Sequence, residues 1–248
     1  MLTANTFVRT TTITAVHLEE ECTSFSGMGT ALTEDGRVID FGLQFSMSRR
    51  LCEYAGISMS SAVSMIDPLV INVSSDVTHI SDQSFYFDLD CDGTEDKISN
   101  LGAGSGFLAL DKNGDGKIGD GSELFGTKSD NGFEDLRMYD SDGNGWIDEN
   151  DDVYGQLRVW MRGADGTDTL LSLQEADVGA IFLGNAETQF SHYGGFGGLG
   201  GLAAGGLSDG LTGSPENFGV TGMTRSSGIF LKESGGVGTV QQVDLAAL

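Results

Sequence analysis

The chain has 248 residues, with 37 Asp and Glu against 13 Lys and Arg, and a formal net charge of −24 at pH 7. This charge argues against binding to nucleic acid or to an anionic membrane surface, because both depend on clusters of Lys and Arg. No apolar run approaches the ~18 residues of a membrane span, and the N-terminal segment lacks the apolar core of a secretory signal. Apolar residues make up 39% of the chain, which is enough for the core of one large domain or two small ones.

The first 66 residues predict mostly strands. Residues 7–15 are rich in Thr, Val and Ile, and residues 30–33 and 38–45 flank an Asp-Gly pair that is typical of a tight hairpin turn. Residues 49–65 have a mixed composition and predict a short helix. We therefore interpret residues 1–66 as a small β-rich N-terminal region.

From residue 67 onward, short apolar segments alternate with acidic loops. Strands are expected at residues 69–73, 85–87, 157–161, 180–183, 228–231 and 237–243, the last two as a closing hairpin, with a helical turn at 172–176. Residues 194–213 contain ten Gly in twenty positions and predict a flexible loop. With helices expected beside one of the acidic loops, the sequence predicts an α+β fold in which residues 67–248 form a module organised by these loops.

The acidic residues concentrate in residues 88–152, which hold 14 of the 24 Asp and four Glu against five Lys and Arg. Asp interleaved with Gly and Asn is typical of oxygen ligands presented on tight turns, as Ca²⁺ requires. Three loops show this pattern, so we expect Ca²⁺ to be the cofactor. A fourth acidic segment, residues 165–168, is short and lacks upstream acids, and it predicts a simple turn.

The first loop begins at Asp88 and has carboxylates at positions 1, 3, 5 and 9, with Gly at position 6. Four carboxylates this close repel one another unless a cation lies between them. The bidentate Glu that closes an EF-hand at position 12 is absent, and the flanking segments resemble strands, so we expect this loop on a β-hairpin. The expected ligands are Asp88, Asp90, Asp92, Asp96 and the carbonyl of Thr94.

The second and third loops follow the EF-hand spacing more closely and together resemble an EF-hand pair. In the second loop the closing acid is displaced by one position to Glu123, so either the loop bulges or Asp120 replaces it. In the third loop the pattern is complete, with an entering helix expected at 133–139 and an exiting helix at 151–156. The candidate ligands are Asp111, Asn113, Asp115, Lys117, Asp120 and Glu123 in the second loop, and Asp140, Asp142, Asn144, Trp146, Asp148 and Asp151 in the third.

Other catalytic and redox motifs are absent from the sequence. There is no HExxH zinc motif and no GxSxG nucleophile elbow, and a GxGxxG match at residues 195–200 falls inside the Gly-rich tract without a βαβ pattern. Cys22, Cys52 and Cys91 form no CxxC motif. Two alternatives remain: a disulfide between Cys22 and Cys52 in an oxidising compartment, or three reduced thiols.

The bond between Asp67 and Pro68 has distinctive chemistry. The prolyl nitrogen belongs to a tertiary amide, which is more easily twisted and protonated than a secondary amide and leaves more readily. The Asp67 side chain can reach its own carbonyl carbon and close a five-membered anhydride. Correct orientation contributes several kcal/mol to such an intramolecular reaction.

The motifs follow one another in a recognisable order. They are DPLVI at 67–71, FDLDCDGTED at 87–96, GFLALDKNGDGKIGDGSELFG at 106–126, YDSDGNGWIDENDD at 139–152, LRVW at 157–160 and SLQEADVGAI at 172–181. This order resembles the calcium-dependent self-processing module of iron-regulated RTX proteins from Gram-negative bacteria. The resemblance covers residues 67–183 and, more loosely, the rest of the C-terminal part. Residues 72–76 depart from it, since the family tends to carry an acidic run there.

The resemblance implies a function and a setting. Ca²⁺ would trigger scission between Asp67, the nucleophile, and Pro68, the leaving residue. Water or a Lys amine of another protein would then open the aspartyl anhydride, and the Lys route would leave an isopeptide cross-link. A secreted or cell-surface protein in millimolar Ca²⁺ would fit these loops, although no N-terminal signal is recognisable.

Two other functions remain open from the sequence. One is a non-catalytic, calcium-stabilised interaction or adhesion module, in which Asp67-Pro68 is only a turn between domains. The other is an EF-hand sensor that exposes a groove, which the scattered Met residues favour less.

Overall fold

The computed structural model describes residues 6–12, 17–32, 38–53, 58–194 and 219–247. Within these ranges strands are the dominant regular structure and helix is almost absent, so the predicted α+β fold class is wrong and the described chain is all-β. The only α-helix in this part of the chain is α1 (Gly132–Arg137), and one 3-10 turn, η1 (Gly121–Glu123), precedes it. None of the helices described is long and apolar enough to cross a membrane.

The predicted helix at 49–65 is replaced by strands. One strand continues to Glu53, and another begins at Ser58. Pairing along the whole of the second strand outweighs any local helix preference of its Ser and Ala residues.

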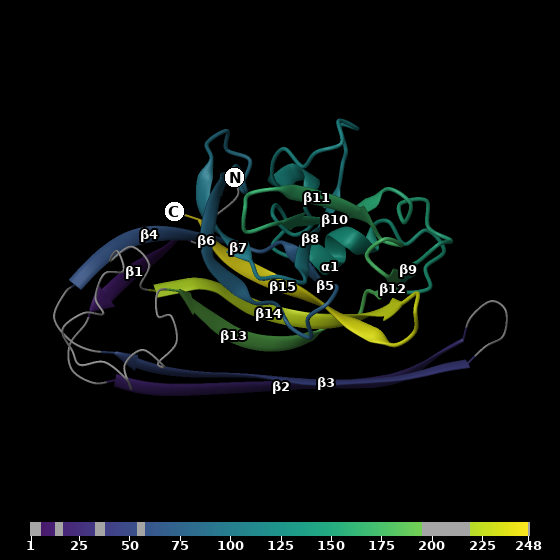
Figure 1. Cartoon of the computed structure of the whole chain (residues 1–248), viewed down its shortest axis with the longest axis horizontal. Coiled ribbons are helices and arrows are strands. Elements are labelled where there is room, and N and C mark those ends of the chain that lie inside the picture. Colours follow the sequence, from purple (N-terminus) through teal and green to yellow (C-terminus); the bar gives the residue numbers. More distant parts are fainter. Residues whose placement is uncertain (1–5, 13–16, 33–37, 54–57, 195–218, 248) are drawn as a thin grey trace.

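Most strands belong to one antiparallel sheet of 11 strands (Figure 1). Its main path runs β11-β10-β8-β5-β15-β14-β12-β9, with β4 beside β15, β1 beside β4, and β13 beside β14. The strands are β1 (Thr6–Thr12), β4 (Ser58–Ile66), β5 (Leu69–Asn72), β8 (Ser105–Leu110), β9 (Trp146–Ile147), β10 (Leu157–Arg162), β11 (Asp168–Ser172), β12 (Val178–Phe182), β13 (Ala186–Gly194), β14 (Gly219–Lys232) and β15 (Val237–Ala247).

Several of these strands match their predicted positions. The closing hairpin is formed by β14 and β15, and the helical turn expected at 172–176 is closed by a hydrogen bond from Ala176 N to Ser172 O (3.0 Å). The strands β8, β9, β11 and β13 were not predicted. The Gly-rich tract at 194–213 lies outside the described residues apart from Gly194, which ends β13.

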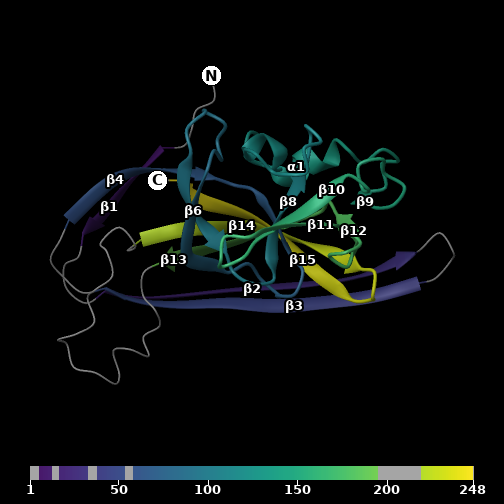
Figure 2. The same ribbon diagram turned by 45° about the horizontal axis from the view of Figure 1, so that its top comes forward.

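A long hairpin, β2 (His17–Leu32) and β3 (Val38–Glu53), runs beneath the main sheet (Figures 1 and 2). It confirms the predicted hairpin, although both strands are longer than expected. Phe45 and Met47 on β3 pack with Phe190 on β13, and Thr23 donates a hydrogen bond to the Gln189 carbonyl (2.8 Å). The hairpin is therefore fastened to the sheet through β13.

The strand register of this hairpin bears on the open question of a disulfide. Cys22 lies opposite Ser48, whereas Cys52 lies opposite Leu18, four residues further along the ladder. Four residues of a strand span roughly 13 Å, too far for a disulfide. Cys22 is accordingly a free, exposed thiol.

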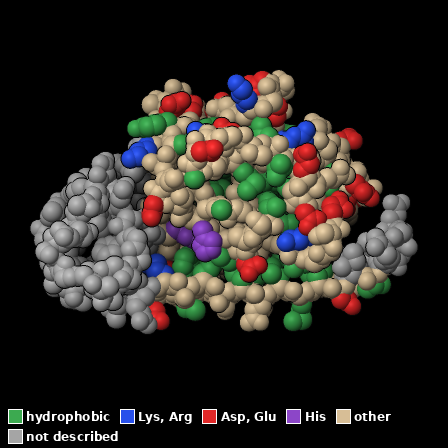
Figure 3. Space-filling view, in the orientation of Figure 1, with side chains coloured by type: hydrophobic (Ala, Val, Ile, Leu, Met, Phe, Trp, Pro, Cys, Tyr) green, Lys and Arg blue, Asp and Glu red, His purple; other side chains and the backbone are tan. Residues whose placement is uncertain are grey.

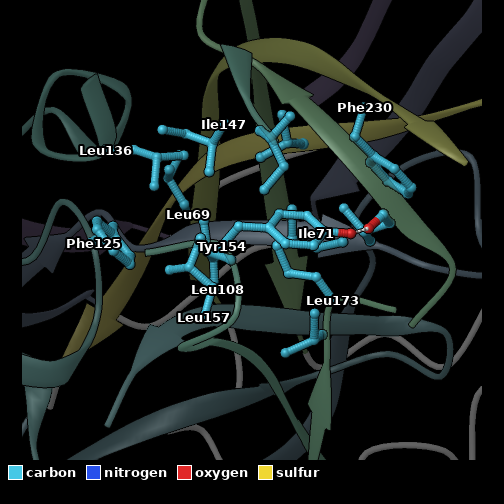
Figure 4. Close-up of a cluster of buried hydrophobic side chains, with 14 of the residues drawn as sticks. Leu69, Ile71, Leu108, Phe125, Leu136, Ile147, Tyr154, Leu157, Leu173 and Phe230 are labelled. Carbon is cyan, nitrogen blue, oxygen red and sulfur yellow. Dashed lines mark hydrogen bonds between the residues drawn. The ribbon is translucent and has the colours of Figure 1, made fainter. Parts of the chain in front are cut away.

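The strand β5 is buried on both faces and lies between two hydrophobic clusters. Leu69 and Ile71 point into one cluster, whereas Val70 points into the other, because successive side chains of a strand face opposite sides. Figure 4 shows Leu69 and Ile71 surrounded by residues of β8, β10, β14 and α1. Tyr154, also in this cluster, donates a hydrogen bond to the Val178 carbonyl (2.7 Å).

The second cluster is covered by a short hairpin, β6 (Ile80–Phe87) and β7 (Asp96–Leu101). Phe85 and Phe87 both pack on Trp160 of β10, with ring centroids 5.9 and 5.0 Å away. Between them, Tyr86 points outward and is 66% exposed, whereas Phe87 is 6% exposed. This hairpin positions the first acidic loop over the aromatic cluster.

The two neighbouring aromatic residues of β6 provide a test of this packing. We expect Phe87→Ala to lower the free energy of unfolding by about 3 kcal/mol or more, because it leaves a cavity against Trp160. The adjacent change Tyr86→Ala should cost less than about 0.5 kcal/mol, since that ring contacts solvent. Urea unfolding of both variants measures the difference, and equal losses would contradict the packing described.

Candidate functional site

Loop 1 (residues 88–96) connects β6 to β7, so the predicted β-hairpin is confirmed. Backbone amides turn toward its carboxylates: the Asp92 and Gly93 amides each donate to Asp88 (3.1 Å), and the Thr94 amide donates to Asp92 (2.7 Å). Asp90 also accepts from the Asp92 amide (3.1 Å). One tight turn therefore directs three carboxylates to the same side.

Asp96, at position 9 of loop 1, lies within the electrostatic influence of the other three carboxylates. One of its oxygens is buried and has no hydrogen-bond partner among the described residues. Burial, followed by the charges of Asp90, Asp92 and Asp88, raises the pKa of Asp96 to about 6. Asp96 is nevertheless not among the three residues of loop 1 whose oxygens lie within 4.8 Å of one another.

Loops 2 (residues 111–123) and 3 (residues 140–151) share one hydrogen-bond pattern. The first carboxylate accepts from the amides at positions 4, 5 and 6, and the oxygen at position 3 accepts from position 5. The side chain at position 5 accepts from the amide at position 7, which is Lys117 in loop 2 and Trp146 in loop 3 (2.8 and 2.7 Å). Positions 4 and 6 are Gly in both loops and have positive φ, which these turns require.

The closing acids of the two loops occupy equivalent places. Glu123 accepts from the amides of Lys112 and Gly119 (3.1 and 2.8 Å), which are positions 2 and 9 of loop 2. Asp151 accepts from the corresponding amides of Ser141 and Asp148 (2.7 and 3.0 Å) in loop 3. Both carboxylates are 3% exposed.

This geometry decides between the two acids left open in loop 2. Glu123, one place late in the sequence, turns back into the loop, whereas Asp120 caps η1 by accepting from the Ser122 amide (2.7 Å). The bulged arrangement therefore places Glu123, and not Asp120, at the position that Asp151 occupies in loop 3. The sequence alone could not show it, because the extra residue is absorbed by the 3-10 turn.

The segments that flank loops 2 and 3 differ from those of an EF-hand pair, so the predicted resemblance to such a pair is wrong for most of the flanking helices. Loop 2 runs from β8 into η1 and has no flanking helix, and residues 151–156 form successive turns in place of the exiting helix. The entering helix of loop 3 is confirmed in shortened form as α1. The strand β9 of loop 3 pairs with β12 rather than with loop 2, because the sheet provides a nearer partner.

Among the residues that the structure describes, two groups of carboxylates could hold a metal ion, and in each group the oxygens lie within 4.8 Å of one another. In Figure 3, acidic side chains gather at the end of the body beside β9 and β12, where loop 3 lies. The chemistry of these oxygen donors fits a hard cation such as Ca²⁺. The groups are Asp88, Asp90 and Asp92 in loop 1, and Asp140, Asp142 and Asp151 in loop 3.

Residues 165–168 form the turn that was predicted. The turn joins β10 to β11 and is closed by a hydrogen bond from Gly163 N to Thr167 O (2.8 Å). Asp165 accepts from the Thr167 amide (3.0 Å), which lowers the pKa of its carboxyl. No other carboxylate in the described chain groups with it as a metal site.

Asp67 and Pro68 lie inside the main sheet, at the junction of two strands. Both β4 and β5 pair with β15 in one continuous register, with Ile66 opposite Leu245 and Leu69 opposite Gln242. The Pro68 carbonyl accepts from the Val243 amide (3.1 Å). Pro68 has no amide hydrogen to donate, so the ladder is interrupted at this bond.

The side chain of Asp67 is 1% exposed and is surrounded by polar groups from the end of the chain. The Gln242 amide nitrogen donates to one oxygen of Asp67, and an Arg225 nitrogen lies 3.9 Å from the same oxygen. Burial, followed by the charge of Asp244, raises the pKa of Asp67 to about 7, and Gln242 and Arg225 oppose this effect. The nucleophile predicted from the sequence is therefore a carboxyl group held partly protonated near neutral pH.

The segment after loop 2 packs directly on this bond. The Leu69 amide donates to the Phe125 carbonyl (3.0 Å), and Gly126 lies so close to Asp67 that a Cβ there would come 2.2 Å from the Asp67 carbonyl oxygen. The next turn supplies the Asp130 carbonyl, which accepts from Gln242 (2.9 Å). Residues 124–131 thus link loop 2 to Asp67, and α1 continues from them to loop 3.

Loops 1 and 2 are also joined to each other. The Gly121 amide donates to the Asp88 carbonyl (2.8 Å), and Thr127 donates to the Gly121 carbonyl (2.6 Å). The beginning of loop 1 is therefore one hydrogen bond away from η1, which leads into the segment on Asp67.

The sequence did not identify the partners of Asp67 on β14 and β15, which are Arg225, Gln242 and Asp244. The sequence did contain a weak indication of these partners, because Arg225 and Asp244 are isolated charges in segments that are otherwise mostly apolar or neutral. The sequence separation of more than 150 residues between Asp67 and these partners concealed their proximity.

The raised pKa of Asp67 predicts a pH-dependent stability. The folded state binds this proton more tightly than the unfolded state, so the contribution of Asp67 to stability falls as pH rises from about 4 to about 7. In a Pro68→Ala background, which removes the labile Asp-Pro bond, Asp67→Asn should therefore raise the free energy of unfolding at pH 8, by on the order of 4 kcal/mol at most, and hardly at pH 4.

Urea unfolding at the two pH values measures this gain. Asp165→Asn is the control, because its carboxyl is fully exposed and should give no such gain at pH 8. An equal effect of Asp67→Asn at both pH values would contradict the raised pKa.

Comparison with known protein families matches residues 69–199 to the SPM domain. The match contains all three acidic loops and covers more than half of the 248 residues. It begins two residues after Asp67 and ends before β14, so Arg225, Gln242 and Asp244 lie outside it, whereas Asp130 lies within it. The chain belongs to the SPM domain family.

Proposed function

We propose that this protein is a calcium-triggered self-cleaving module that breaks its own Asp67–Pro68 bond. The observation that carries the proposal is the packing of residues 124–131 on that bond. This segment starts directly after Glu123, the closing acid of loop 2, and reaches loop 3 through α1. Ordering of the loops would therefore shift the backbone that contacts the Asp67 carbonyl. Gly126 lies so close to this carbonyl that no side chain would fit at position 126.

The loops offer the ligands for the trigger. Carboxylate and amide oxygens of loops 1, 2 and 3 would hold Ca²⁺, with the carbonyls of Thr94, Lys117 and Trp146 as further ligands. Bound Ca²⁺ supplies positive charge that offsets the 18 acidic residues of the 88–152 region. Millimolar Ca²⁺ outside the bacterial cell would suit such loops, and the same ions would be scarce before export.

The chemistry of scission belongs to Asp67 and Pro68. A carboxylate oxygen of Asp67 attacks its own carbonyl carbon, and the bond to the Pro68 nitrogen breaks as a cyclic anhydride forms. Gln242 holds the attacking side chain, and the Val243 amide holds the Pro68 carbonyl, so that attack begins from an ordered geometry. Burial of Asp67 keeps bulk water away until the anhydride exists.

The anhydride has two outcomes. Water would restore a free carboxyl at Asp67, whereas a Lys amine of another protein would form an isopeptide bond. We propose the Lys amine as an acceptor, because an amine is the stronger nucleophile once the aspartyl end becomes accessible.

The closing acids provide a test of calcium binding. Glu123→Gln should remove or strongly weaken one site in calorimetric titration, because Glu123 points into loop 2. Asp120→Asn, three residues earlier, should leave the stoichiometry unchanged, since its side chain caps η1. The proposed role of Glu123 is refuted if both variants bind Ca²⁺ as the native chain does.

Self-cleavage is tested directly by mass spectrometry of the purified chain with and without millimolar Ca²⁺. We expect a fragment that begins Pro68-Leu69-Val70, and none in EDTA. Asp67→Asn should be inert because it lacks the nucleophile, and Asp67→Glu should be much slower because a six-membered closure adds a rotatable bond. Pro68→Ala should also be slower, since a secondary amide is a poorer leaving group.

Calorimetry on Asp67→Asn is the control for these reactions, because that variant should still bind Ca²⁺. A chain that stays intact for days in Ca²⁺ would refute self-cleavage. If it nevertheless bound Ca²⁺ and gained stability, a non-catalytic, calcium-stabilised interaction module would be the remaining function.

A further inference from the structure

We infer that Asp244 is a partner of Asp67 in scission: the two carboxyl groups share one proton, which passes to the Pro68 nitrogen as the bond breaks, while Arg225 holds Asp244. This inference rests on the proposed self-cleavage and adds residues that lie beyond the segment matching the SPM domain. It is carried by strand register, a β-bulge and an unpartnered buried oxygen.

The register places the two residues opposite each other in the sheet. Ile66 is opposite Leu245 and Leu69 is opposite Gln242, so Asp67 lies opposite Asp244 across the β4–β15 junction. Side chains directly opposite in an antiparallel pair share a face, with Cβ atoms roughly 5 Å apart. Like charges in this arrangement are destabilising, which favours a single negative charge shared by the two groups.

A β-bulge brings the Arg225 guanidinium next to Asp67 and Asp244. The register of β14 with β15 shifts between Thr224 and Ser226, so Arg225 is the extra residue. Bulges redirect side chains and are frequent beside active sites. The Arg225 Nε donates to Asp244 Oδ2 (2.7 Å), and its Nη1 lies 3.9 Å from Asp67 Oδ2.

The burial of the pair leaves one oxygen free for a proton. Asp67 and Asp244 are each 1% exposed, and Asp244 Oδ1 has no hydrogen-bond partner among the described residues. The charged groups that face Asp67 are Asp244 on β15, Arg225 on β14 and Asp130 in the turn before α1. Two carboxylates against one guanidinium thus remain near Asp67 besides its own charge, so a proton is favoured there.

The titration of both groups agrees with this geometry. Burial is the main cause that raises the pKa of Asp67 and of Asp244, and the Arg225 charge opposes it in both cases. An ordinary Asp is ionised at neutral pH and has no proton to give. The buried pair can retain one under the conditions in which the proposed cleavage takes place.

The reaction balances with this proton. The pair starts with one proton and one negative charge. An Asp67 oxygen forms a bond to the Asp67 carbonyl carbon, and the electron pair of the breaking C–N bond goes to the Pro68 nitrogen, which takes the shared proton. The products are the neutral anhydride, the neutral prolyl amine and the Asp244 carboxylate, which stays paired with Arg225.

The pH dependence of cleavage distinguishes this role from a structural one. With Asp244→Asn, we expect cleavage in millimolar Ca²⁺ at pH 7 to fall about tenfold or more, and the alkaline side of the rate profile to move at least one pH unit lower, because Asp67 loses the neighbouring charge that favours its protonation. Asp244→Glu, which keeps the carboxyl, should recover part of the rate. Asp165→Asn removes one acidic charge from an exposed turn and should leave the profile unchanged.

A second measurement does not depend on cleavage. In a Pro68→Ala background with excess Ca²⁺, carbon NMR of the Asp67 carboxyl should show its pKa falling by one unit or more when Asp244 is changed to Asn. Thermal unfolding and calcium stoichiometry confirm that each variant is folded. An unchanged Asp67 titration and an unchanged rate profile in Asp244→Asn would overturn the shared proton while self-cleavage stood. A native chain that is never cut would instead remove self-cleavage itself, and with it the proton transfer.

Discussion

The pairing of β15 with two successive strands is the constraint on which the rest of the structure depends. A single strand near the end of the chain aligns β4 and β5 in one register, and the only break between them is the Asp67–Pro68 bond. Because β15 also pairs with β14, the sheet brings Asp244, Gln242 and Arg225 to that break. The chain thus folds its own C-terminal strands over a bond about 175 residues away.

Short, directly contacting segments connect the acidic loops to the Asp67–Pro68 bond. Loop 2 ends three residues before Gly126, loop 1 is hydrogen-bonded to η1, and α1 leads from the turn on Asp67 to loop 3. The buried strand β5 follows this bond directly, and its side chains pack in both hydrophobic clusters. Order in the loops and geometry at Asp67 are therefore connected through a few short, well-packed segments.

Local sequence patterns predicted the acidic loops and the short hairpins, whereas the pairing of strands far apart in the sequence could not be predicted from them. The Asp-Gly spacing of the loops, the β-hairpin of loop 1 and the closing hairpin follow from neighbouring residues. Of the two helices expected beside loop 3, only the entering one is present, as α1. The exiting helix is absent because residues 151–156 need only turns to reach β10. Arg225 escaped notice because a bulge, which has no sequence signature here, redirects it toward Asp67.

The junction of β4 with β15 also determines what a cut chain would look like. Residues 1–67 would remain hydrogen-bonded to β15 through Ser64, Met65 and Ile66, and the β2–β3 hairpin would remain packed on β13. The immediate product would be a nicked particle rather than two separate fragments. The lifetime of the new aspartyl end beside the body would then be governed by how fast these strands peel away, so strand dissociation would decide which nucleophile reaches it.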